Sequence, residues 1–193
     1  DIPLYYHGVI TLMDQYFDDD FGTSAPCNVN VACEQGVGWG CQINSVCKIT
    51  AGGGSGTGTL INNDCCDLTP FVLTANHNLP ESGVDPIYWN FRFHYQSPVC
   101  KPSEEPNPLQ WVTYLGATIN ASWEDTDFLL LELNDRLNHD DNLSFSGWDR
   151  RDVSIEEATM IHHPRGDVKK ISFDDDPMIT ISAFSNSTGS VVL

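Results

Sequence analysis

The sequence predicts an all-β fold, and three features of the chain support that prediction. Its apolar stretches are short, and turn-forming residues separate them. Apolar and polar residues alternate over residues 89–94, which is the pattern of a strand with one buried face. Fifteen Gly and eleven Pro favour a turn-rich sheet over a helical bundle. A chain of 193 residues suits one medium domain or two small ones.

The strands are expected in two groups. The first group comprises residues 43–49, 57–61, 71–74, 87–95, 111–119 and 128–133. The second group comprises residues 158–162, 169–173 and 178–184. Short strands at this spacing, without helical periodicity, indicate a barrel or a sandwich.

Two segments between these strands are expected to be irregular. Residues 52–58, with the sequence GGGSGTG, are expected to form a flexible hairpin turn. They do not fit a phosphate-binding loop, because the required Lys is absent and a strand follows instead of a helix. Residues 97–109 contain four prolines and are expected to form a loop.

The charge balance excludes two classes of partner. Nine Lys and Arg face 27 Asp and Glu, which gives a formal net charge of −18. Nucleic acids and anionic membrane surfaces are bound through basic patches, so we expect no nucleic-acid or membrane partner. No apolar run approaches the ~18 residues of a membrane span. We interpret the acidity as a source of solubility.

Seven cysteines in a chain of this length indicate an oxidising compartment, so we expect a secreted protein, extracellular or periplasmic. No C-x-x-C spacing is present, and we expect no metal and no cofactor. An odd number of cysteines leaves one without a partner inside the chain. The chain opens with Asp1 and not Met, which we interpret as a processed or trimmed start.

His77 and Asp127 are the candidate catalytic residues. A serine hydroxyl needs a base to become a nucleophile, and that base needs a carboxylate to fix its tautomer. His77 follows the apolar run 71–74, so it is expected at a strand exit. Asp127 precedes the apolar run 128–131, so its carboxylate is expected to be half-buried and to need a partner such as a histidine N–H. Spacing alone favours a simpler interpretation, in which His77 is a loop residue and Asp127 a turn former.

Four stretches shift that balance, because together they resemble the secreted chymotrypsin-like (trypsin-like) serine endopeptidases, most closely the bacterial lysyl-endopeptidase group. The stretches are CNVNVAC at 27–33; GTLINN at 58–63 with FVLTANH at 71–77; DFLLLELN at 127–134; and GWDR at 147–150 followed by IHHP at 161–164. The resemblance implies a trypsin-like antiparallel β-barrel fold with a cleft between two barrels. It also implies that His77 is the general base, that Asp127 orients it, and that the substrate is a protein or peptide.

The same resemblance suggests a division of the chain. Residues 1–26 are expected to be an N-terminal tail or residual pro-segment, and residues 27–145 the first barrel, carrying His77 and Asp127. Residues 146–193 are expected to begin a second barrel that is incomplete here. No Gly-x-Ser-Gly segment follows Asp127. We therefore interpret the chain as a fragment without its nucleophile, inactive alone, whose partner is the missing C-terminal barrel of the same protein.

The cysteines can be assigned in part from the resemblance. It implies a Cys33–Cys100 disulfide, with the partner of Cys27 lying beyond Leu193. Cys41, Cys47, Cys65 and Cys66 are then expected to form two further bridges, in a pairing that the sequence does not assign. One departure concerns position 78, where this chain has Asn and the resembled group has Cys.

Two other interpretations stay open at the level of sequence. The chain could be a non-catalytic protease homologue that acts as a secreted binding module. A weaker alternative is a secreted β-sandwich adhesin with chance matches to the protease stretches. The sequence downstream of Leu193 would separate the first of these from an enzyme, and disulfide mapping would test the second.

Overall fold

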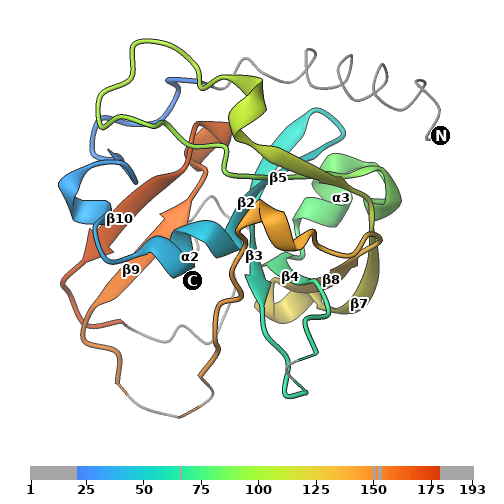
Figure 1. The fold of residues 1–193 in the computed structure, drawn as a ribbon. Helices are drawn as coiled ribbons and strands as arrows, with labels where there is room; N and C mark the ends of the chain where they lie inside the picture. The colour runs from blue at the N-terminus through green and yellow to red at the C-terminus, as the bar shows by residue number, and fades with distance from the viewer. Residues whose placement is uncertain (1–20, 66, 150, 152–153, 179–193) are drawn as a thin grey trace.

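The computed structural model of the protein describes residues 21–65, 67–149, 151 and 154–178, and it consists mainly of two antiparallel sheets (Figure 1). The larger sheet has the order β6-β5-β2-β3-β4-β8-β7, and the smaller one has the order β1-β10-β9. The all-β prediction is therefore confirmed. Within the described residues, no helix has the length and apolar character needed to cross a membrane.

The strands and helices have the following bounds. The larger sheet contains β2 (Val46–Ala51), β3 (Gly54–Ile61), β4 (Phe71–Ala75), β5 (Asn90–Phe93), β6 (Val112–Leu115), β7 (Ala117–Trp123) and β8 (Phe128–Leu133). The smaller sheet contains β1 (Val29–Asn30), β9 (Ala158–His162) and β10 (Lys170–Asp174). Two α-helices, α2 (Gly40–Ser45) and α3 (Asn78–Ser82), accompany the 3₁₀ turns η1 (Glu34–Gly36), η2 (Pro86–Tyr88), η3 (Pro108–Gln110), η4 (Glu124–Thr126), η5 (His139–Asp141) and η6 (Pro164–Gly166).

Gly116 makes the larger sheet curl into a barrel. β6 and β7 lie at opposite edges of the sheet, yet this single residue separates them in the chain, so the two edges have to meet. The Gly116 N–H donates to the Trp89 carbonyl at 2.8 Å, and the Gly116 carbonyl accepts from the Asn134 N–H at 3.1 Å. With β6 and β7 counted as one bent strand, the barrel has the predicted trypsin-like arrangement of six.

The barrel interior holds the main core. Strands β4 and β8 alternate between buried and partly exposed residues, so one face of each points inward. The core combines aliphatic and aromatic side chains that are almost fully excluded from solvent, among them Leu60, Val72, Trp89, Phe91, Phe93, Leu129 and Leu131. Burial of a large apolar side chain contributes about 1.5–3 kcal/mol, so this cluster is the principal source of barrel stability.

Two segments of the first half differ from the sequence prediction. Residues 43–49 were expected to be one strand, but α2 ends at Ser45 and β2 starts only at Val46. The helical turn directs Ile43 into a second small core with Val31 and Ile171, outside the barrel. The Gly-rich segment 52–58 is mostly strand, because only Gly52 and Gly53 form the turn between β2 and β3. Both have a positive φ, as a two-residue hairpin turn requires.

The later strands are close to the predicted ones. The predicted strand 87–95 is shortened to β5, because residues 87 and 88 belong to the 3₁₀ turn η2. The Asp85 carboxylate caps this turn by accepting from the Ile87 N–H at 3.0 Å. The predicted strand 111–119 is divided at Gly116. Strands β8 and β9 have the predicted bounds, and β10 is shifted by one residue. Residues 179–184 of the last predicted strand lie outside the described residues.

The strands of the small sheet come from both ends of the described residues. β1 pairs with β10 through Val29–Ile171 and Asn30–Lys170, although our division placed residues 29 and 30 in the first barrel. The buried Asp167 carboxylate accepts from the Gly22 N–H at 2.9 Å and from the Ser24 N–H at 3.2 Å. Residues 22–24, which our division assigned to a tail, are therefore fixed to the loop between β9 and β10.

The cysteines confirm one expectation and correct another. Cys33 and Cys100 form a disulfide, as the resemblance implied. Cys41, Cys47 and Cys65 are free thiols, so the expectation that they take part in two further bridges is wrong, and Cys66 lies outside the described residues. The reason is placement: Cys47 is buried inside the barrel core, whereas Cys41 and Cys65 are exposed. Cys27 is also free and exposed.

Candidate active site

His77 and Asp127 meet at the end of two paired strands. The β4–β8 ladder pairs Ala75 with Phe128, so the next pair outward is Asn76 and Asp127. The Asn76 N–H donates to the Asp127 carbonyl at 2.9 Å, which extends the ladder by this one pair. His77 then leaves the strand as the first residue before α3. Strand pairing between segments 50 residues apart thus brings the two candidates together.

Asp127 has a backbone conformation that is uncommon outside glycine. Its φ of 52° and ψ of 37° are left-handed, and its N–H donates to the Glu124 carbonyl at 3.1 Å at the end of η4. Asp tolerates this region better than most residues. The left-handed turn places a buried carboxylate beside His77, in accordance with the predicted need for a partner.

The carboxylate binds His77 at two points. Asp127 Oδ2 lies 2.6 Å from His77 Nδ1, and Asp127 Oδ1 accepts from the His77 backbone N–H at 2.7 Å. A carboxylate accepts hydrogen bonds, so the ring proton is on Nδ1 and the lone pair is on Nε2. The His77 side chain is 50% exposed while Asp127 is buried. Among the described residues, Asp127 is the one hydrogen-bond partner of the ring.

His77 lines a cleft between the barrel and the small sheet. The cavity measures about 570 Å³. Its barrel wall comes from β3, β4 and the start of α3, and its opposite wall comes from β9, which lies beside the barrel in Figure 1. Trp39 and Gln42, at the start of α2, and Glu81 of α3 also line the cleft. An unprotonated imidazole nitrogen is thus available to a molecule bound in this cleft.

The sequence analysis missed Glu81 and Trp39 as residues of the cleft. Glu81 lies four residues after His77 at the start of a short helix, so helical spacing puts both on the same face. That signal could have been found from the sequence. Trp39 offered no such signal, because it approaches the cleft through the tertiary packing of α2 against β3.

The adjacent pair His162 and His163 lies on the other side of the cleft. His163 is buried, and its Nδ1 contacts the Asp167 carbonyl at 2.9 Å. Burial, with the nearby positive charge of Lys169, lowers the pKa of His163 well below 6.5, so it is neutral. His162 is half-buried and its Nε2 contacts Ser172 Oγ at 3.1 Å. The two adjacent histidines therefore differ in environment, His163 being buried and His162 partly exposed.

The described residues contain no group of three or more His, Cys, Asp or Glu side chains arranged to hold a metal ion.

Comparison with known proteins shows which family the sequence matches. The family model described as "Lysyl endopeptidase, C-terminal domain" matches residues 21–192. A protein named lysyl endopeptidase from Pseudomonas aeruginosa is 27% identical over 181 residues. That alignment covers 89% of this chain and 39% of the relative, so the chain spans well under half of the relative's length.

Proposed function

The chain belongs to the lysyl endopeptidase C-terminal domain family, and from that membership we propose that it is part of a secreted serine endopeptidase. His77 is the general base of the proposed enzyme, and Asp127 is the residue that orients it. The observation that carries the proposal is the 2.6 Å contact between Asp127 Oδ2 and His77 Nδ1 at the edge of a cleft. The substrates are protein or peptide chains.

In the proposed reaction, a serine hydroxyl attacks the carbonyl carbon of a peptide bond. His77 Nε2 takes the hydroxyl proton as the serine oxygen bonds to that carbon, and then gives it to the departing amine. The result is an acyl-enzyme, which water hydrolyses with His77 again as the base. Asp127 stabilises the imidazolium that forms and keeps the proton on Nδ1 between steps.

The serine is proposed to come from sequence that the printed chain does not contain. None of the described serine hydroxyls hydrogen-bonds the His77 ring, whose one contact is with Asp127. The small sheet on the far side of the cleft is the part of the fold from which such a segment would approach His77. Secretion is supported by the Cys33–Cys100 disulfide, which persists in oxidising compartments.

A fluorophosphonate probe, which labels activated serines, tests the proposal. The protein that carries this chain together with its C-terminal continuation should be labelled at one serine, and the 193-residue chain alone should not be. His77→Ala should abolish labelling of the longer protein. His139→Gln is the matched control, because this histidine is fully exposed on η5, away from the cleft, and should be labelled normally.

Two results would overturn the proposal. One is stoichiometric labelling of a serine within the 193 residues, because the nucleophile would then lie inside the chain. The other is a longer protein that is folded yet neither labelled nor able to cleave a denatured protein substrate. That second result would favour the non-catalytic binding module. In such a protein the His77–Asp127 pair would stabilise the fold and would take no part in catalysis.

A further inference from the structure

Asn78, the residue after His77, is the first member of a series of hydrogen bonds that does not include the His77–Asp127 pair. Asn78 Nδ2 donates to Thr74 Oγ1 at 3.0 Å. Thr74 Oγ1 in turn donates to the Thr57 carbonyl at 2.8 Å. Asn78 is the residue at which this chain departs from the Cys of the resembled group, so the contact is a feature of this sequence.

The direction of these hydrogen bonds is fixed by chemistry. An amide NH₂ group only donates and a carbonyl only accepts, so the Thr74 hydroxyl has to accept from Asn78 and donate to Thr57. Thr74 is buried, with 5% of its surface exposed. A buried hydroxyl is costly to leave with an unpaired acceptor site, which favours the observed position of the Asn78 side chain.

The same series of hydrogen bonds continues to the end of a strand of the small sheet. Thr57 Oγ1 accepts from the His163 backbone N–H at 2.9 Å. His163 directly follows β9, the strand that lines the cleft opposite His77. Thr57 therefore joins the two walls of the cleft, with its carbonyl facing the His77 side and its hydroxyl facing the small sheet.

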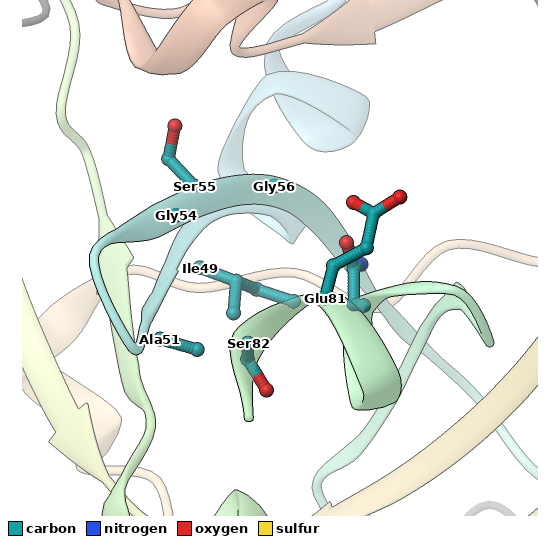
Figure 2. A pocket seen from close by; sticks show the side chains of 8 residues that line it. Ile49, Ala51, Gly54, Ser55, Gly56, Glu81 and Ser82 are labelled. Carbon is teal, nitrogen blue, oxygen red and sulfur yellow. The ribbon is translucent and has the colours of Figure 1, made fainter. Parts of the chain in front are cut away.

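The space for Asn78 is provided by Gly56. A Cβ atom at position 56 would lie 3.1 Å from Asn78 Nδ2 and 3.3 Å from Asn78 Oδ1, which is too close for normal packing. Gly56 lines a small cavity of about 170 Å³. In Figure 2, Gly56 lies on β3 on one side of this pocket, and Glu81 and Ser82 of α3 lie on the other side. The glycine lets the amide of Asn78 lie directly against the β3 backbone.

We propose that Asn78 is a positioning residue for the reaction, which through Thr74 and Thr57 holds the His77 turn in register with the small sheet. This inference rests on the proposed function, because it concerns the orientation of the His77 base. Proton transfer from the serine requires His77 Nε2 to lie within hydrogen-bond reach of a group carried by the other side of the cleft. A displacement of about 1 Å at such a site costs on the order of 10²-fold in rate.

Two substitutions and one conservative variant test the inference in the complete protein. Asn78→Ala removes the donor, and Thr74→Val removes the hydroxyl while keeping the side-chain shape. Both should lower kcat roughly 10-fold to 100-fold with little change in KM. Thr74→Ser keeps the hydroxyl and should retain a kcat within about twofold of the unmodified protein. The Nδ1 proton resonance of His77, followed by NMR, should broaden in the first two variants and persist in Thr74→Ser.

The outcomes separate this inference from the proposed function. If His77→Ala abolishes activity while Asn78→Ala and Thr74→Val keep normal kcat and lose only thermal stability, Asn78 is merely structural and the inference is wrong. If His77→Ala leaves activity unchanged, the proposed function itself has failed. Should Thr74→Val not fold, Asn78→Ala decides alone, since its side chain is only partly buried and its loss leaves the barrel core intact.

Discussion

Asp127 holds His77 by both its ring and its backbone, with Oδ2 lying 2.6 Å from Nδ1 and Oδ1 lying 2.7 Å from the main-chain nitrogen. One carboxylate thus fixes the position of the turn and the tautomer of the imidazole at the same time. A loss of this group should affect the chemistry more than the fold, because the Asn76–Asp127 backbone contact would remain.

Asp127→Asn should lower kcat of the complete protein by about 10⁴, the effect of the same change in a serine-protease triad. An asparagine can donate an N–H to His77 Nδ1. The ring proton would then be on Nε2, and Nε2 could no longer accept the serine proton. Steady-state hydrolysis of a peptide ester measures this effect. Asp140→Asn is the control, because Asp140 is 91% exposed, and it should leave kcat unchanged. A kcat within tenfold of normal for Asp127→Asn would contradict the assigned role.

Asp167 should make the protein sensitive to acid. Burial acts to raise the pKa of this carboxyl, but hydrogen bonds from Ser24, Gly22 and Val168 outweigh it and hold the pKa below 3.8. Because the folded-state pKa is the lower one, the stabilisation is complete above the unfolded pKa and disappears as the pH falls through the folded value.

Asp167→Asn should therefore destabilise the protein by about 1–3 kcal/mol at pH 7, and the difference from the unmodified protein should shrink below about pH 4. Urea unfolding followed by fluorescence at several pH values measures both quantities. Asp175→Asn, at an exposed position of the same region, should match the unmodified protein throughout. A constant difference between pH 2 and pH 7 would show that the ionised carboxylate is not the stabilising form.

Gly116→Ala should destabilise the closure of the barrel between β6 and β7. Gly116 has a φ of 74°, and a Cβ atom there would lie 2.5 Å from both Asn134 Nδ2 and the Ile87 carbonyl oxygen. The conformational cost alone is about 1–3 kcal/mol, and the clash adds to it. Thermal unfolding should show a clearly lower Tm. Gly147→Ala is the matched control, because a Cβ there meets no atom within 4 Å and its φ is not in the positive range, so its Tm should barely change.

Cys47 should resist alkylation in the native protein. Burial raises the pKa of its thiol to about 12, and the thiolate is the reactive form. Iodoacetamide at pH 8, followed by mass spectrometry, should modify Cys41 and Cys65, which are exposed, and leave Cys47 unmodified until urea is added. Rapid native labelling of Cys47 would contradict its placement inside the barrel.

The fold class, most of the strands and both members of the candidate pair could be predicted from the amino-acid sequence. The strands follow from local patterns: alternation along 89–94, short apolar runs, and turn residues between them. The candidate pair rests in addition on the resemblance of four stretches to the lysyl-endopeptidase group. Strand β8 was predicted with its correct bounds because it coincides with a short, nearly continuous run of apolar residues.

The tertiary structure alone decided which distant groups meet. The bend at Gly116, the helical start at Gly40–Ser45 and the free thiol of Cys47 depend on packing between segments that are far apart in sequence. The same holds for the contacts from Asn78 through Thr74 and Thr57 to His163, which cross two sheets. Hydrophobic periodicity reports which face of a strand is buried, but it carries no information about the neighbour against which that face packs.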